Sequence, residues 1–172
     1  MRKSEEELRD AAAWEAIEEA TELLQEERTR ESLVALRDVL KADPRNHYAF
    51  YYLGVALFES GEAEAARDAY LACLKLAPHH LNARVALTHV LRGLGALKDA
   101  LMQGMSALQE APSDAKVLHA LGLVYLARGD SLAAKKYLEA FLAAGPEFEV
   151  AVEVRELLAG LGLGVLPKIE DD

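Results

Sequence analysis

The chain repeats itself every 34 residues, and this period limits the possible folds more than any other feature. Each copy of the repeat places a leucine, a glycine, an alanine and a proline at fixed offsets. The copies contain Leu53, Gly61, Ala66 and Pro78, then Leu87, Gly95, Ala100 and Pro112, then Leu121, Gly129, Ala134 and Pro146. A fixed period of this length is typical of stacked supersecondary units, because one unit alone cannot bury its apolar face.

Each recurring residue suits a hairpin of two helices. The leucine belongs to a helical stripe with the residues three positions before it and four positions after it, which are apolar or aromatic in every copy except at Arg84. The glycine near the middle of each copy ends the first helix, and the proline ends the second. Gly54 and Gly122 follow the leucine directly, and their missing side chains would let the two helices approach closely.

The first copy reads Phe50-x-x-Leu53-Gly54, then Ala66-x-x-x-Tyr70, then Pro78. This pattern resembles the tetratricopeptide repeat. The resemblance is strong in residues 47–80, good in 115–148 and looser in 81–114, where Thr88 replaces the glycine and Gly104 replaces the aromatic residue. It implies an all-α fold, namely a right-handed α-solenoid of helix-turn-helix repeats with capping helices at both ends.

Helices are predicted over residues 4–27, 30–41, 47–59, 63–76, 81–93, 97–109, 115–128, 131–143 and 147–159. In the first of them, Ser4 and Glu7 form a candidate capping box. The predicted domain organisation is an N-terminal helix with a degenerate or capping repeat (1–46), three repeats (47–80, 81–114 and 115–148), a C-terminal capping helix (149–160) and a tail (161–172). The stretch from Gly160 to Ile169 alternates glycine with apolar residues, so it is either a frayed end or a segment that docks in a groove.

The charge distribution argues against nucleic acid as a partner. The formal net charge is -10, whereas nucleic acid binding needs clustered Lys and Arg. The excess acid lies in residues 1–46 and 149–172, and residues 47–148 carry 10 acidic and 9 basic side chains. We expect a cytoplasmic protein, because we find neither an apolar signal segment after Met1 nor an apolar run long enough to span a membrane.

Catalytic and metal-binding motifs are not evident. There is no phosphate-binding loop and no HExxH motif, and the five histidines are scattered along the chain. Cys73, the only cysteine, occupies a small-residue position of its repeat and is predicted to be a buried apolar side chain. We therefore expect a non-enzymatic chain without a metal or cofactor.

The resemblance places ligand contacts on the first helix of each repeat, which lines a concave groove in this family. The implied peptide-binding positions are Tyr48, Tyr51, Val55 and Phe58 in the first repeat, Asn82, Val85, His89 and Arg92 in the second, and Lys116, His119 and Leu123 in the third. Trp14, Ile17, Thr21 and Leu24 take the equivalent places in the degenerate repeat. An alternative is that the N-terminal helix covers Tyr51 and Phe58, which would then be core residues.

These positions favour a protein or peptide partner with apolar anchors and one or two acidic residues. Some members of the family clamp a peptide carboxylate with lysine and asparagine where this chain has Tyr51 and Val55, so a chaperone-tail ligand is disfavoured. His89 and His119 would gain charge near pH 6.5 and change the affinity. The leading hypothesis is an adaptor, scaffold or assembly factor, with self-association through the terminal helices left open. The alternative is a cytoplasmic secretion chaperone of the type III translocator class, to which the architecture is similar.

Overall fold

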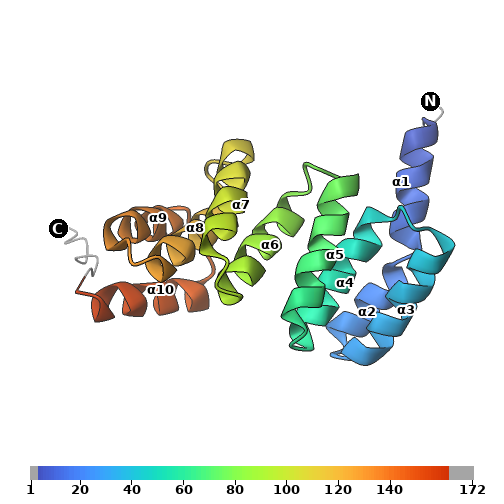
Figure 1. Cartoon of the computed structure of the whole chain (residues 1–172), viewed down its shortest axis with the longest axis horizontal. Helices are drawn as coiled ribbons and strands as arrows, with labels where there is room; N and C mark the ends of the chain where they lie inside the picture. The colour runs from blue at the N-terminus through green and yellow to red at the C-terminus, as the bar shows by residue number, and fades with distance from the viewer. Residues whose placement is uncertain (1–3, 163–172) are drawn as a thin grey trace, which may run out of the picture. The chain divides into compact units, whose positions relative to one another are not determined.

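The computed structural model describes residues 4–162, and these residues form α-helices connected by short turns (Figure 1). The helices are α1 (Glu5–Glu15), α2 (Glu18–Gln25), α3 (Thr29–Ala42), α4 (His47–Glu59), α5 (Ala63–Leu76), α6 (Leu81–Gly93), α7 (Leu97–Glu110), α8 (Ala115–Ala127), α9 (Ser131–Ala143) and α10 (Phe148–Gly160). The predicted all-α fold is therefore confirmed, and from α4 onward each helix starts and ends within one residue of its predicted bounds. Most of the predicted tail, residues 163–172, lies outside the described residues.

The prediction of one helix over residues 4–27 is wrong, because the chain turns between α1 and α2. The N–H of Ile17 donates to the carbonyl of Trp14 at 3.0 Å, which tightens the last turn of α1. Ile17 then starts α2 and is completely buried. The predicted capping box at the start of α1 is confirmed, since Ser4 and Glu7 bond each other's backbone N–H.

The chain divides into two compact units, one ending at Ala96 and the other starting at Leu97. In the first unit, α2 to α6 pack in chain order, each helix against the next, and α1 contacts α4. In the second unit, α7 packs on α8, α8 on α9, and α9 on α10.

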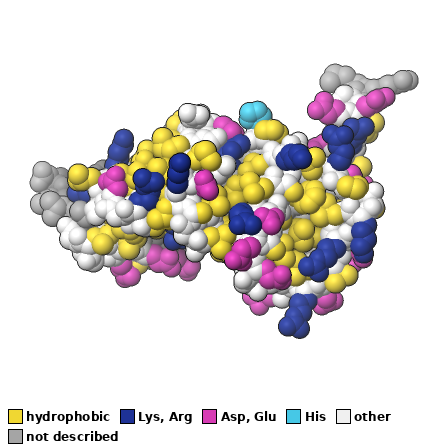
Figure 2. Space-filling model, in the orientation of Figure 1, with side chains coloured by type: hydrophobic (Ala, Val, Ile, Leu, Met, Phe, Trp, Pro, Cys, Tyr) yellow, Lys and Arg dark blue, Asp and Glu magenta, His cyan; other side chains and the backbone are white. Residues whose placement is uncertain are grey.

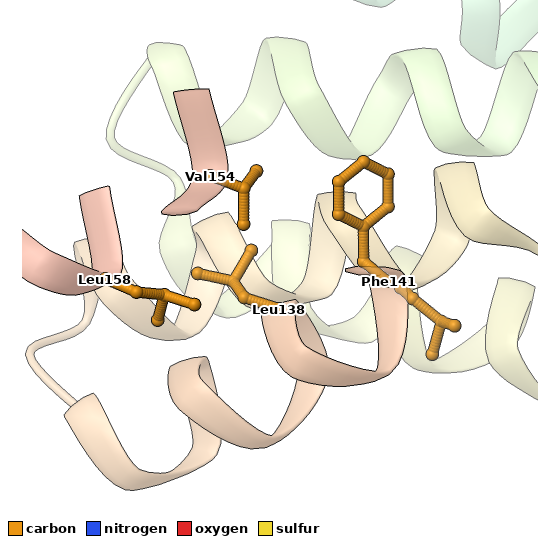
Figure 3. Packing of buried hydrophobic residues seen from close by; sticks show 5 residues of the cluster. Leu138, Phe141, Val154 and Leu158 are labelled. Atoms are coloured by element: carbon orange, nitrogen blue, oxygen red, sulfur yellow. The ribbon is translucent and has the colours of Figure 1, made fainter. Parts of the chain in front are cut away.

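Close helix approaches at two glycines shape the cores of the units. In the first unit, a Cβ added to Gly54 would lie 2.5 Å from the ring of Tyr70, which is buried on α5. In the second unit, a Cβ added to Gly122 would lie 2.5 Å from Leu138. Leu138 belongs to a buried apolar cluster with Leu118, Phe141, Val154 and Leu158 (Figure 3). The prediction that these glycines permit close contact is confirmed.

The predicted ends of the first helices are confirmed as well. Gly61, Gly95 and Gly129 follow α4, α6 and α8 with φ angles of 80°, 76° and 77°. Residues with a side chain rarely adopt this left-handed conformation, so glycine ends each helix and lets the chain reverse. No helix within residues 4–162 combines the length and the apolar character needed to cross a membrane.

Candidate peptide-binding surface

Side chains immediately before α4, α6 and α8 fix where these helices begin. Asn46, His80 and Asp114 stand 34 residues apart, and each accepts a hydrogen bond from the backbone N–H three residues later. The acceptor of His80 is Nδ1, at 3.1 Å from the nitrogen of Ala83. Asn and Asp are preferred at this position because their oxygens satisfy an unpaired N–H of the first turn. Sequence reasoning missed these caps, although Asn46 and Asp114 stand two repeat periods apart and could have marked them.

Aromatic rings of α4 and of neighbouring segments form a cluster, which we call the α4 aromatic cluster. Tyr51 lies 5.0 Å from Tyr52, 6.0 Å from Tyr70 and 4.8 Å from His80, measured between ring centroids. Rings at such distances stabilise one another beyond the area that they bury. The cluster consists of Trp14, His47, Tyr48, Tyr51, Tyr52, Tyr70 and His80.

Burial raises the pKa of Tyr51 above its ordinary value. Burial also lowers the pKa of His80, and the neighbouring His47 lowers it further. A neutral His80 is the form that its cap requires, because a protonated Nδ1 cannot accept a hydrogen bond. Tyr51 and His80 are therefore uncharged near neutral pH.

Helix α1 meets the cluster at Tyr48 and Tyr52. The hydroxyl of Tyr48 donates to Asp10 at 3.0 Å, and the ring of Trp14 lies edge-on to Tyr48 at 5.3 Å. The amide Nδ2 of Asn46 donates to the carbonyl of Ala13 at 2.8 Å.

The remaining predicted positions on α4 lie beyond these contacts along the helix. Tyr51 and Val55 are partly buried, whereas Phe58 is 51% exposed. An exposed phenylalanine next to further apolar side chains is a candidate anchor point for a ligand.

The predicted positions on α6 differ in exposure. Asn82 is exposed, His89 and Arg92 are partly buried, and Val85 is only 7% exposed. Val85 therefore serves packing more than ligand contact. The Nε of Arg92 is buried and makes no hydrogen bond within residues 4–162.

In the second unit the predicted positions lie on α8. Lys116 is exposed, Leu123 is partly buried, and the ring of His119 stacks on Phe141 at 4.8 Å. Neither α6 nor α8 contains an acidic residue, and α4 contains only Glu59. This scarcity contrasts with the 29 acidic residues of the whole chain. Helices α6 and α8 thus repel acidic ligands less than the acid-rich helices α1 and α2 do.

Two observations within residues 4–162 concern side chains that could bind a metal or act as a nucleophile. Within residues 4–162, no group of three or more His, Cys, Asp or Glu side chains is placed to hold a metal ion. Cys73 is buried, and burial raises the pKa of its thiol to about 12. A thiol with such a pKa is almost entirely protonated at neutral pH and is a poor nucleophile.

Comparison with known proteins identifies the fold. Residues 17–80 and residues 115–147 match the tetratricopeptide repeat family. The first match includes α2 and α3, the pair predicted as a degenerate or capping repeat. The chain belongs to the tetratricopeptide repeat family, whose members are generally interaction modules without catalytic activity.

Several solved structures share this fold. PilF of Pseudomonas aeruginosa is 26% identical, with 90% of this chain and 71% of PilF covered and a TM-score of 0.77. MamA from Desulfovibrio magneticus RS-1, from residue 41 to its end, is 21% identical, with 88% of this chain and 86% of the MamA chain covered and a TM-score of 0.74. YrrB, described as having an unusual peptide-binding site, is 20% identical, with 80% of this chain and 71% of the YrrB chain covered and a TM-score of 0.71. A comparison with curated proteins found no match.

Proposed function

We propose that this chain is a non-enzymatic interaction module that binds an extended or helical segment of a partner protein on the first helices of its repeats. The observation that carries the proposal is the exposed Phe58, which continues the partly buried Tyr51 and Val55 along α4. Apolar and aromatic side chains that remain accessible are the usual energetic centres of protein interfaces. The description of YrrB as a peptide-binding protein of the same fold adds support.

The charges on the same helices define the partner's chemistry. Arg92 is a partly buried cation on α6, and α6 lacks acidic residues. A partner segment with an apolar anchor for Phe58 and a carboxylate for Arg92 fits this arrangement. In the second unit, Lys116 and Leu123 on α8 offer a similar combination of a cation and an apolar side chain.

A peptide-display selection on the full chain tests the proposal. Peptides selected from a random library are labelled, and their affinities for the wild type and for variants are measured by fluorescence anisotropy. Phe58→Ala should weaken the selected peptides about tenfold, which is typical of an interface anchor. Arg92→Gln should weaken acidic peptides more than neutral ones, because only the former lose a charge-assisted hydrogen bond.

Leu71→Ala is the matched control. Leu71 is 45% exposed on α5, so the substitution removes a similar exposed apolar group from a second helix of the same unit. It should change the affinities by less than about twofold, as contacts outside an interface do. If Leu71→Ala weakened the selected peptides while Phe58→Ala left them unchanged, the binding surface would lie on the second helices.

A further inference from the structure

A second surface lies on the outer side of the α2–α3 pair, away from the α4 aromatic cluster. The two helices and the turns at their ends border an open hollow of about 980 Å³. On α3 the buried side includes Leu33 and Leu36, and the hollow occupies the other side of the helix, where Val34 and Val39 lie. Val34 is 58% exposed, so it presents apolar surface at the hollow.

The floor of this hollow is apolar and its rim is acidic. Ala20 and Leu23 contribute from α2, and Val34, Ala35 and Val39 contribute from α3. Six acidic residues and two arginines line the hollow, which leaves a net charge of -4. The acidic residues are Glu19, Glu22, Glu26, Glu31, Asp38 and Asp43.

The rim charges stand on both sides of the floor. Glu19 and Glu22 lie on α2, and Asp38 lies on α3, where Lys41 pairs with it at 2.8 Å in an exposed contact. Arg28 bonds Glu26 and Glu31 at one end of the hollow. These cations offset part of the charge, but Arg28, Arg30 and Lys41 together face six acidic residues, so the rim keeps a net negative charge.

The preceding helix of the chain does not fill the hollow. Of the residues before α2, only Ala16 at the end of α1 lines it, and α1 is bonded instead to Tyr48 on α4 and to Asn46, which caps α4. Figure 1 shows α1 extending away from α2 and α3, and Figure 2 shows hydrophobic side chains among charged ones over this pair. In a stack of helical hairpins, an apolar outer side is where another helix packs.

We propose that this α2–α3 hollow is a docking site for a basic amphipathic helix of a partner protein. The apolar floor receives the apolar stripe of that helix, and its Lys or Arg side chains meet the acidic rims on both sides. The 8 residues of α2 and the 14 residues of α3 span about 12 Å and 21 Å at 1.5 Å per residue, which suits a partner helix of two to four turns.

Charge complementarity distinguishes this occupant from a second copy of the chain. The chain carries a net charge of -10, so another copy approaching an acidic rim would on average bring like charge. A basic helix brings opposite charge and also covers Val34. This surface is independent of the proposed peptide contact at Phe58.

Model peptides and the full chain provide the test. The probe is a labelled synthetic helix with leucine along one stripe and lysine on both flanks, and the control peptide has glutamate in place of lysine. We expect the lysine peptide to bind and the glutamate peptide not to bind. The double variant Glu22→Lys/Asp38→Lys should weaken the lysine peptide about tenfold or more, since two opposite-charge contacts become repulsive. Val34→Glu should weaken it as well, because a charge would enter the apolar floor.

The matched control is Glu149→Lys/Glu153→Lys, which changes two exposed acidic residues of α10 and alters the net charge equally. It should leave the affinity within about twofold, because distant exposed charges are screened. Phe58→Ala should also leave it unchanged.

Several results would overturn the proposal. If both double variants weakened the lysine peptide equally, the cause would be the net charge of the chain and not the hollow. If the lysine and glutamate peptides bound equally, the acidic rim would not contribute to binding. Unchanged affinity in Val34→Glu would remove the role of the floor. Sedimentation that shows a dimer of the wild type and a monomer of Val34→Glu would assign the hollow to a second copy. Circular dichroism of each variant separates these results from unfolding.

Discussion

Replacing Gly122 by alanine tests the close approach of α8 and α9. The added Cβ would lie 2.5 Å from Cδ2 and 2.6 Å from Cγ of Leu138, and 3.3 Å from the Leu138 backbone nitrogen. Leu138 is completely buried beside Phe141, Val154 and Leu158, so its side chain has little room to move aside (Figure 3). The two helices must therefore separate, or the cluster must rearrange.

The expected cost is the difference between two opposing effects. Overpacking a well-filled core costs about 1–3 kcal/mol. Alanine in place of glycine favours the helix by about 1 kcal/mol. Because the contact is short and the neighbour is confined, we expect the free energy of unfolding to fall by about 1–2 kcal/mol. Urea unfolding followed by circular dichroism measures this change.

Two further variants decide whether this reasoning is right. Gly160 ends α10 in the same unit, and a Cβ there would meet nothing within 4 Å, so Gly160→Ala should not lower stability. Leu138→Ala should cost about 2–5 kcal/mol alone. The double variant Gly122→Ala/Leu138→Ala should be about 1–3 kcal/mol more stable than the sum of the single changes, because truncation relieves the overlap. A Gly122→Ala protein as stable as the wild type, or strictly additive losses, would refute the argument.

Other predictions concern His80, the middle repeat and Cys73. Burial and His47 lower the pKa of His80, so the free energy of unfolding should fall as the pH drops below 6.5. His80→Asn should reduce this pH dependence while keeping the cap, and an unchanged pH profile in the variant would contradict the assignment to His80. Residues 88–105 contain Gly93, Gly95 and Gly104 and include the division between the two units, so their amides should be the least protected of the repeats in hydrogen exchange. Cys73, with its pKa raised to about 12, should react with a thiol reagent only on unfolding, and rapid labelling of the native protein would contradict its burial.

The helix bounds of the repeats could be predicted because local chemistry sets them. Gly61 and its equivalents adopt a left-handed conformation, and Pro78 and its equivalents follow the second helices, so both ends are determined within a few residues of sequence. The break between α1 and α2 has no such local mark, because the chain there contains neither glycine nor proline. It arises from tertiary contacts, namely the burial of Ile17 and the bond from Asn46 to Ala13.

The candidate sites were predicted less completely than the fold. The resemblance to the tetratricopeptide repeat implied that Tyr51, Phe58 and Val85 face a ligand, but it does not determine how deeply each side chain is buried. Val85 is buried, while Phe58 is exposed. The α2–α3 hollow was not predicted, because it depends on the direction that α1 takes after the break. The cap at His80 was missed because histidine is not among the usual capping residues.

The attachment of α1 has a practical consequence. Helix α1 has no buried residue and is held to α4 by a few contacts, so it can detach at a cost far below that of global unfolding. Trp14 is the chain's single tryptophan and touches Tyr48 and Tyr52 only while α1 is attached. The fluorescence emission spectrum of Trp14 therefore reports on the attachment of α1. During a denaturant titration it will change at a lower denaturant concentration than the circular dichroism signal of the repeats.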